Sequence, residues 1–147
     1  MMHIRPIDVN DREQWLRLRC LLWPGDNAAL EKEVDLYYSG ELAEPEAVLV
    51  AEESGKLLGF VEVSIRPHAE GCHSRRAGYL EAWFVDQKVR RQGIGRSLVA
   101  AAEDWARNQG CTEFASDCEI TNIISARAHL ALGFEEVETI RCFRKTL

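Results

Sequence analysis

The hydrophobic pattern changes its period several times along this chain, most clearly in the second half. Tyr79 to Val85 is a run of aromatic and aliphatic residues broken only by Glu81, which predicts a buried strand. After a polar segment with two glycines, apolar residues return at helical spacing, at Leu98, Ala101, Ala102 and Trp105. The pattern therefore predicts a strand, a basic glycine loop and a helix in that order.

The N-terminus predicts a short strand and then a helix. His3 to Ile7 is mildly apolar, and Pro6 confines it to an edge of a sheet if it is a strand. Asn10 or Asp11 can cap the next helix, with Glu13 placed for a capping box. The apolar face of that helix consists of Trp15, Leu18 and Leu22. Its end is predicted by the Pro-Gly pair at positions 24 and 25.

A second helix and a hairpin follow. The helix is expected from about Asn27 to Tyr38 and closes at Ser39-Gly40. Ala47 to Ala51 and Leu57 to Ile65 are strand-like, and the polar link between them contains a glycine, so they form a hairpin. Arg66 to Ala77 is a polar loop whose length is typical of functional loops.

The remainder of the chain predicts a strand, a helix and an extended end. Gly110 stops the central helix, and Thr112 to Ala115 is a short strand. Asn122 or Thr121 caps a last helix, which ends at Gly133. One face of this helix carries Ile124, Ala128 and Leu132. Residues 135–144 are expected to be extended, as one or two strands.

Length and charge limit the possible functions. A chain of 147 residues, 46% hydrophobic, fits one domain over residues 1–147. The net charge of −6 argues against nucleic acid as a partner, because such proteins need clustered cations. One basic loop in an acidic protein suits an anionic cofactor and a cationic substrate. The alternative is that the acidity only aids solubility.

Cysteine usage and hydropathy bear on the compartment. The five cysteines are an odd number without a CxxC pair, which argues against zinc and against a disulfide framework. No apolar signal core or run of 18 apolar residues is present, so a membrane partner is not expected. We therefore expect a cytoplasmic protein with reduced thiols.

The segment RRQGIG, Arg90 to Gly95, carries the strongest chemical signal. At a helix start the backbone N–H groups are unpaired and the macrodipole is positive, which suits an anion. A P-loop would require a lysine after the glycines, and a dinucleotide fingerprint would require a third glycine where Leu98 stands. Both are excluded. The alternatives left are another phosphate loop and an ordinary turn with solvated arginines.

This loop resembles the pyrophosphate loop of the GNAT superfamily of N-acetyltransferases. A second motif, Asn122-x-x-Ser125-x-x-x-His129-x-x-x-Gly133-Phe134, is similar to the last helix of that superfamily. The resemblance implies an α/β fold with a central mixed sheet flanked by helices on both faces, and acetyl-CoA as co-substrate. The residues it implies for acetyl-CoA are Trp83, Phe84, Val85, Arg90, Arg91, Gln92, Gly93, Ile94, Gly95, Arg96 and Asn122. Many members carry a tyrosine at the position of His129, placed to protonate the departing thiolate.

Shorter matches spread over the whole chain resemble the aminoglycoside 6′-N-acetyltransferases, which confer antibiotic resistance. They include Leu22-Trp23-Pro24-Gly25, Leu80-Glu81, Ala115-Ser116-Asp117 and Phe143-Arg144-Lys145. The resemblance implies a homodimer and an aminoglycoside site made by Trp23, Glu81, Asp117 and Glu138, with a contact from the loop around His68. That loop is shorter here than in the family and lacks a tyrosine.

The chemistry gives each candidate a role and an ordinary alternative. A carboxylate buried without a partner is costly, so Glu81 must meet a substrate cation, a structural network or water. Asp117 is expected to take the amine proton, directly or through water, although it could simply cap the last helix. His129 is the candidate acid, because histidine can donate a proton near neutral pH, or else it is a packed core residue. Trp23 is a pocket wall or the last core residue of its helix.

The sequence thus predicts an acetyl-CoA-dependent aminoglycoside 6′-N-acetyltransferase. Two other functions remain open at this point. One is a GNAT enzyme for polyamines, small amines or protein N-termini, and the other is a non-catalytic acetyl-CoA sensor.

Overall fold

A computed structural model describes residues 1–147 and has a five-stranded sheet at its centre. The strands are β1 (His3–Pro6), β2 (Ala47–Glu53), β3 (Lys56–Arg66), β4 (Ala77–Val85) and β5 (Glu113–Ser116), and they lie side by side in chain order. Neighbouring strands are antiparallel except for β4 and β5, which are parallel. The predicted mixed sheet is confirmed, and β1 lies at an edge as Pro6 requires.

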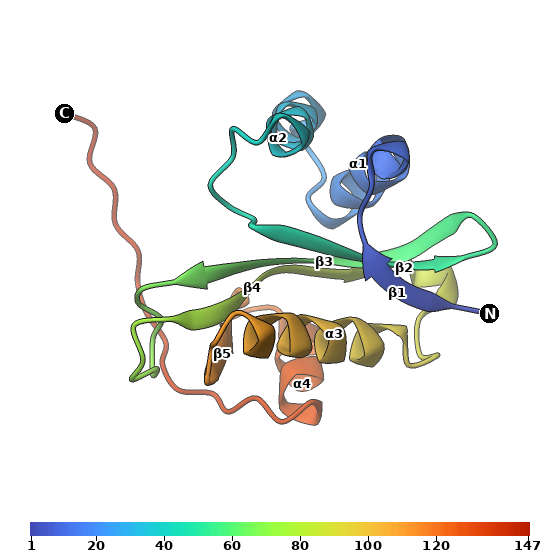
Figure 1. Ribbon diagram of the computed structural model, residues 1–147. Coiled ribbons are helices and arrows are strands. Elements are labelled where there is room, and N and C mark those ends of the chain that lie inside the picture. The colour runs from blue at the N-terminus through green and yellow to red at the C-terminus, as the bar shows by residue number, and fades with distance from the viewer.

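Helices cover both faces of this sheet (Figure 1). On one face lie α1 (Arg12–Leu22) and α2 (Asn27–Ser39), and on the other lie α3 (Ile94–Asn108) and α4 (Ile123–Ala131). Two short 3-10 turns, Val9–Asp11 and Gln87–Val89, precede α1 and α3. No helix is both long enough and apolar enough to span a bilayer.

Each face of the sheet has its own hydrophobic core, which explains the apolar stripes of the sequence. The α1 and α2 side is built around Trp15, Leu18, Val34, Phe60 and their neighbours. The α3 side contains Leu98, Val99 and Ala102, packed on strand residues such as Val61, Val63 and Leu80. By contrast, α4 has no fully buried residue, and Ile124 on its predicted apolar face is 81% exposed.

A β-bulge interrupts the central strand at Glu81. Glu62 on β3 is paired with Ala82, and the next residue, Val63, is paired with Leu80, so Glu81 has no partner residue across the ladder. The extra residue reverses the inside–outside alternation, because Leu80 belongs to the α3 core whereas Ala82 belongs to the α1 and α2 core. Glu81 is thus part of an irregularity that the apolar pattern did not predict.

Beyond this bulge, β4 has a neighbour on one side only. The parallel pairing with β5 begins at Ala77 and Glu113 and ends at Leu80 and Ser116. The antiparallel pairing with β3 continues to Val85. Residues 81–85 therefore have a backbone edge without a second strand, at the centre of the molecule and directed toward α4 and the start of α3.

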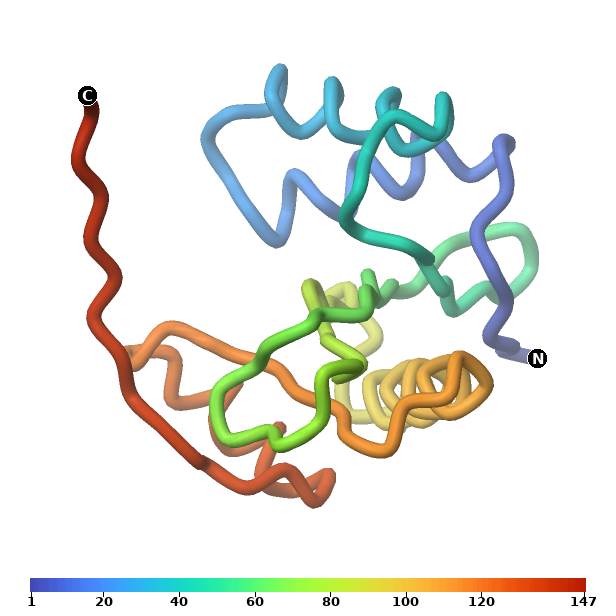
Figure 2. The backbone as a smooth tube through the Cα atoms, turned by 60° about the vertical axis from the view of Figure 1, so that its left-hand side comes forward, coloured from blue at the N-terminus to red at the C-terminus, as the bar shows by residue number.

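Two local predictions need correction. Asp11 is the N-terminal cap residue of α1, as predicted, but its side chain makes no capping hydrogen bond to this helix. The capping box belongs instead to the preceding turn Val9–Asp11, where Asp8 accepts from the N–H of Asn10 and the Asp11 carboxylate accepts from the N–H of Asp8. Asp11 also binds Arg5 through both oxygens, at 2.7 and 2.9 Å, so tertiary pairing decided its role. Residues 135–147 are extended but form no strand, because they lie apart from the sheet (Figure 2).

Candidate active site

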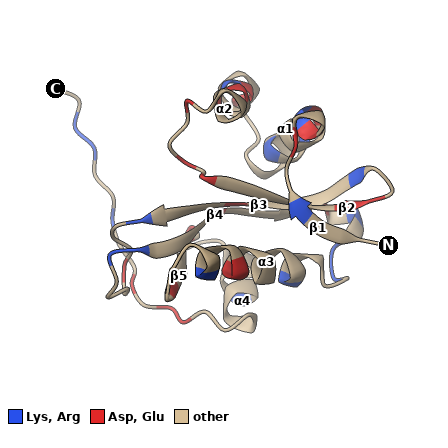
Figure 3. Cartoon of the chain, viewed as in Figure 1, with Lys and Arg blue, Asp and Glu red and all other residues tan.

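The loop before α3 has the geometry expected of an anion site. Gly93 is the N-terminal cap residue of α3, with a φ of 81°, and no side chain caps this helix end. A Cβ atom placed on Gly93 would meet no atom within 4 Å, so the backbone is open on this side. Arg91, Gln92 and Arg96 are exposed around it, whereas Ile94 is buried in the α3 core. Figure 3 shows the basic stretch that leads into α3. The loop therefore fits a pyrophosphate held by helix N–H groups.

Gly95 has a different reason to be glycine. A Cβ atom there would lie 3.3 Å from the indole nitrogen of Trp83, which is closer than such contacts normally are. Trp83 is half-buried under the start of α3, on the open part of β4. The glycine thus allows the helix to approach the strand, so that the anion loop and the open edge of β4 lie next to each other.

Arg90 folds back onto the end of β4. Its Nε donates to the carbonyl oxygen of Val85 at 2.8 Å, and its guanidinium lies 5.4 Å from the centre of the Phe84 ring. Val85 is one of the residues predicted to hold acetyl-CoA, and its carbonyl is engaged by the protein's own cation. Arg90 therefore caps the strand end as well as lying beside the anion loop.

Glu81 and Asp117 belong to a row of four side chains, each in contact with the next. Both Glu81 oxygens accept hydrogen bonds from Arg66, at 2.9 and 2.5 Å, and the Arg66 guanidinium lies 3.6 Å from the centre of the Tyr79 ring. The hydroxyl of Tyr79 donates to Asp117. Burial, followed by the hydrogen bond to Asp117, raises the pKa of Tyr79, so this hydroxyl keeps its proton. The structure thus brings the two predicted acids together through one arginine and one tyrosine.

The two acids differ in their exposure and in whether a cation already pairs with their charge. Glu81 is half-buried and its charge is matched by Arg66, whose pKa is raised by that hydrogen-bonded pair. Asp117 is exposed, and its only hydrogen-bond partner is a neutral phenol. Asp117 does not cap α4, because that role belongs to Asn122, whose side chain accepts from the N–H of Ser125. Asp117 is therefore a carboxylate available to an incoming cation, while Glu81 must be shared with Arg66.

His129 lies on the other side of the β4 edge, held at both ring nitrogens. Nδ1 is 2.7 Å from the carbonyl oxygen of Ser125, and Nε2 is 2.7 Å from the hydroxyl oxygen of Ser116. The imidazole contacts Trp83 edge-on, with ring centres 5.2 Å apart, and it also meets Phe134. His129 is half-buried rather than enclosed, so it is not an ordinary core histidine.

Trp23 follows the last residue of α1, beside a buried ion-pair network. It is 38% exposed, and the Arg19 guanidinium lies 5.0 Å from the centre of its ring. Arg19 in turn binds Glu62 on β3 at 2.8 Å and Glu33 on α2 at 2.8 Å. Trp23 is thus not a core residue of α1. It is an exposed aromatic surface held in place by a buried arginine.

Two predicted substrate residues make no hydrogen bond or ion pair with the acids. Glu138 is exposed on the extended C-terminal segment and makes no ion pair or hydrogen bond within the chain. His68 is exposed in the loop between β3 and β4. The middle of that loop is held by Glu113, which accepts from the N–H groups of His73 and Ser74, and these bonds lower its pKa. Side-chain contacts therefore link Glu81 to Asp117 through Arg66 and Tyr79, and neither Glu138 nor His68 takes part in them.

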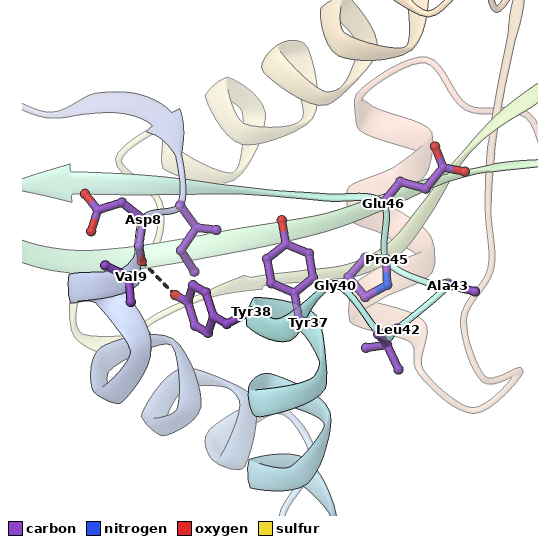
Figure 4. Close-up of a pocket in the computed structure, with 10 residues that line it drawn as sticks. Asp8, Val9, Tyr37, Tyr38, Gly40, Leu42, Ala43, Pro45 and Glu46 are labelled. Atoms are coloured by element: carbon purple, nitrogen blue, oxygen red, sulfur yellow. Dashed lines mark hydrogen bonds between the residues drawn. The ribbon is translucent and has the colours of Figure 1, made fainter.

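A shallow, open pocket of about 450 Å³ lies elsewhere, between α2 and the start of β2. Figure 4 shows Tyr37 and Tyr38 in its wall, with Tyr38 donating a hydrogen bond to the carbonyl of Asp8. None of the predicted site residues lines it. The candidate site is instead the open edge of β4 with the groups on its two sides.

Sequence reasoning missed three residues here, namely Arg66, Tyr79 and Ser116. The need of Glu81 for a partner was predicted, with a substrate cation, a structural network and water left open, but its pairing with Arg66 depends on how β3 and β4 pair around the bulge. Ser116 carried a signal of its own, since it directly follows the predicted strand Thr112 to Ala115. Its contact with His129 could not be predicted, because it joins the end of β5 to α4, and that contact depends on how the helix packs.

Comparison with known proteins agrees with this architecture. Residues 12–134 match the model of the acetyltransferase (GNAT) family. The chain is 51% identical over 146 residues to an aminoglycoside N(6′)-acetyltransferase type 1 of Klebsiella aerogenes, covering 98% of this chain and 96% of that protein. It is 37% identical over 147 residues to a protein of the same name from Serratia marcescens, covering 95% and 96%.

Solved structures agree over the whole length. The structure of AAC(6′)-Iy in complex with the bisubstrate analogue CoA-S-monomethyl-acetylneamine superimposes with a TM-score of 0.91 at 36% identity, covering 100% of this chain and 99% of that one. AAC(6′)-Iy in complex with CoA gives the same TM-score of 0.91, covering 100% and 96%. An anion loop, an open strand edge and end-to-end likeness thus lead to one conclusion: the chain belongs to the GNAT family of acetyltransferases, among the aminoglycoside N(6′)-acetyltransferases.

Proposed function

We propose that this protein transfers the acetyl group of acetyl-CoA to the 6′-amine of aminoglycosides and thereby confers resistance to them. The observation that carries the proposal is the position of Asp117 and Glu81 beside the open edge of β4, which continues into the anion loop of α3. The relatives named for this activity, and the CoA and aminoglycoside analogue bound to AAC(6′)-Iy, support it.

The residues suggest how acetyl-CoA is held. The backbone N–H groups around Gly93, Ile94 and Gly95 take the pyrophosphate, and the exposed arginines of the loop add charge. The pantetheine arm follows residues 83–85 of β4 as a further strand would, and Asn122 lies near its reactive end. A backbone N–H of β4 polarises the thioester carbonyl, as oxyanion donors do.

The acids have different roles, because binding the reacting amine and removing its proton place opposite demands on a carboxylate. A carboxylate beside an ammonium raises the pKa of that ammonium, and each unit corresponds to about 1.4 kcal/mol, so strong binding of the reacting amine opposes the reaction. Glu81 is already matched by Arg66 and therefore attracts a second cation only weakly. Asp117 is exposed and accepts the amine proton, while Trp23 and Glu138 contact the rest of the sugar.

A free-thiol assay tests the function directly. The protein should release CoA thiol with acetyl-CoA and aminoglycosides that carry a 6′-amine, and the same compounds with a 6′-hydroxyl should be inert. Mass spectrometry should place one acetyl group on the 6′ nitrogen. Brisk acetylation of spermidine or of a peptide N-terminus without turnover of any aminoglycoside would overturn the substrate. Binding of acetyl-CoA without transfer to any amine would indicate a sensor.

We also propose that the protein is a homodimer in the cytoplasm, with residues 1–147 acting as one domain. The C-terminal segment supports the dimer, because Val137, Ile140 and Phe143 are 58%, 53% and 90% exposed, and β5 has an unpaired outer edge. Such an edge and such a segment favour strand pairing between two copies. The five free cysteines fit a reducing compartment.

Light scattering tests the dimer. The wild-type protein should have twice the mass of the chain, 16.7 kDa. Ile140→Asp with Phe143→Asp should shift it to the mass of one chain, whereas Ile120→Asp, at a residue 76% exposed outside this segment, should not. A wild-type mass of one chain would refute the dimer.

A further inference from the structure

The contact between Ser116 and His129 decides which atom of the imidazole can act. Ser125 offers a backbone carbonyl to Nδ1 at 2.7 Å, and a carbonyl oxygen can only accept a hydrogen bond. Nδ1 must therefore carry the hydrogen. Nε2 is then the exchangeable position, and it faces the hydroxyl oxygen of Ser116 at 2.7 Å. Any proton that leaves His129 through Nε2 passes first to Ser116.

Other groups enclose the ring. Trp83 meets the imidazole edge-on with ring centres 5.2 Å apart, and Phe134 meets it with ring centres 5.1 Å apart. The Ser125 hydroxyl lies 3.4 Å from Nδ1, beside the carbonyl that already holds this nitrogen. The Ser116 hydroxyl is thus the one polar side chain at Nε2.

Ser116 also lies at the point where the strands part. It is the last β5 residue paired with β4, opposite Leu80, and the bulge at Glu81 follows immediately. From Leu80 to Val85 the open edge of β4 spans about 17 Å at the usual rise per residue. An extended donor that begins at the anion loop and follows this edge ends beside Ser116.

The next residue, Asp117, is directed the other way. Its carboxylate accepts from Tyr79, which belongs to the cluster with Ala69 and Ala77, whereas Ser116 contacts α4. Consecutive residues of an extended chain point to opposite sides. The end of β5 therefore places a carboxylate on one side of the gap and a hydroxyl backed by an imidazole on the other.

We propose that Ser116 is a catalytic residue that hands the proton of His129 to the departing thiolate; this rests on the proposed acetyl transfer. As the carbon–sulfur bond breaks, the sulfur takes the hydroxyl proton of Ser116. The hydroxyl oxygen takes the Nε2 proton of the imidazolium, whose Nδ1–H stays on Ser125. His129 becomes neutral, Ser116 is unchanged, and Asp117 holds the amine proton. Exchange with water returns one proton to His129 and removes one from Asp117.

Single-turnover kinetics of four variants test the relay, because they isolate the chemical step from product release. Ser116→Ala and His129→Phe should each slow acetyl transfer about 10²-fold, the usual contribution of a general acid. The double variant should be no slower than either single variant, since both remove one pathway. Ser39→Ala removes a hydroxyl at the exposed end of α2, far from the site residues in the sequence and in the fold, and is the control, expected within about threefold of wild type. Affinity for acetyl-CoA, measured by calorimetry, should change little in all four.

Several results would overturn the relay. If His129→Phe is slow but Ser116→Ala loses less than tenfold, His129 donates directly. If the double variant is slower than each single variant by the product of their effects, the two residues act independently. Ser116→Thr keeps a hydroxyl and should recover most of the rate; a variant as slow as Ser116→Ala would leave Ser116 only a packing role.

Nitrogen-15 NMR of the histidine rings supplies a readout without substrate. In the wild-type protein the Nε2 resonance of His129, assigned by its loss in His129→Phe, should have the shift of a protonated nitrogen that donates a hydrogen bond to Ser116. It should move in Ser116→Ala and stay in Ser39→Ala. An Nε2 resonance unaffected by Ser116→Ala refutes the contact, even if aminoglycosides prove not to be the substrate. If only the free-thiol assay with aminoglycosides fails, the proposed acceptor substrate is wrong, while the contact between Ser116 and His129 stands.

Discussion

Arg19→Met tests whether the buried network behind Trp23 holds the fold together. The Arg19 side chain is 5% exposed and Glu62 is 3% exposed, with Nε and Oε2 2.8 Å apart. Trp15 also donates to Glu62 at 3.1 Å, and Arg19 donates to the carbonyl of Leu30 at 3.2 Å. Methionine fills a similar volume, but it leaves the Glu62 carboxylate without its cation. Breaking such a pair from one side costs about 3–5 kcal/mol.

The magnitude can be converted into a melting temperature. Each kcal/mol corresponds to about 3–4 °C for a chain of this length, so Arg19→Met should lower the Tm by roughly 12 °C. Arg107 is the matched control, because its pair with Asp104 is 66% and 72% exposed. Arg107→Met should stay within about 0.5 kcal/mol of wild type. Chemical denaturation gives the free energies of unfolding.

The loss of unfolding free energy caused by Arg19→Met should also depend on pH. Burial raises the pKa of Glu62 against the pull of Arg19, and without the arginine only the weaker effect of the Trp15 hydrogen bond still opposes it. A folded-state pKa above the ordinary value of 4.5 means that the folded protein binds the proton more tightly. The deficit should therefore shrink as the pH falls from 7 toward 4.5. Adding Glu62→Leu should recover at least half of it, about 2 kcal/mol.

Two results would refute this reasoning. One is an Arg19→Met protein as stable as Arg107→Met, and the other is a double variant with Glu62→Leu that is less stable than Arg19→Met alone. Because Arg19 also packs on Trp23, the variant should raise the KM for the aminoglycoside more than the KM for acetyl-CoA.

Three further predictions concern the anion loop, the acids and acid stability. Gly93→Asp should abolish the rise in Tm caused by acetyl-CoA, whereas Gly110→Asp, with a φ of 87° and equally open space, should keep it. Asp117→Asn should lower kcat about 10²-fold, whereas Glu138→Gln should mainly raise KM; the reverse pattern would exchange their roles. Arg5 lowers the pKa of Asp11, so this carboxylate stabilises the fold above its ordinary value of 3.8 and less as the pH falls through its folded pKa. Asp11→Asn should lower the free energy of unfolding by about 2 kcal/mol at pH 7, and this free energy should then fall less steeply with decreasing pH than in the wild-type protein.

Local patterns in the sequence determined the elements and the donor loop. The apolar run that became β4 and the helical spacing of α3 are short-range properties, so their order could be predicted. The open backbone at Gly93 followed from the same rules for helix ends. The family of the chain was predicted from these local motifs because the residues of an anion loop are adjacent in the sequence.

Only the tertiary structure decided how the chemical groups are paired. Glu81 meets Arg66, and Ser116 meets His129, across elements whose register depends on a bulge that apolar spacing does not reveal. A segment with strand-like residues becomes a strand only when a neighbouring strand pairs with it. Residues 135–144 therefore have a strand-like sequence and still lie unpaired. The local sequence determines which residues prefer a strand or a helix. The partner of a buried charge depends instead on how the whole chain packs, because that packing brings together residues far apart in the sequence.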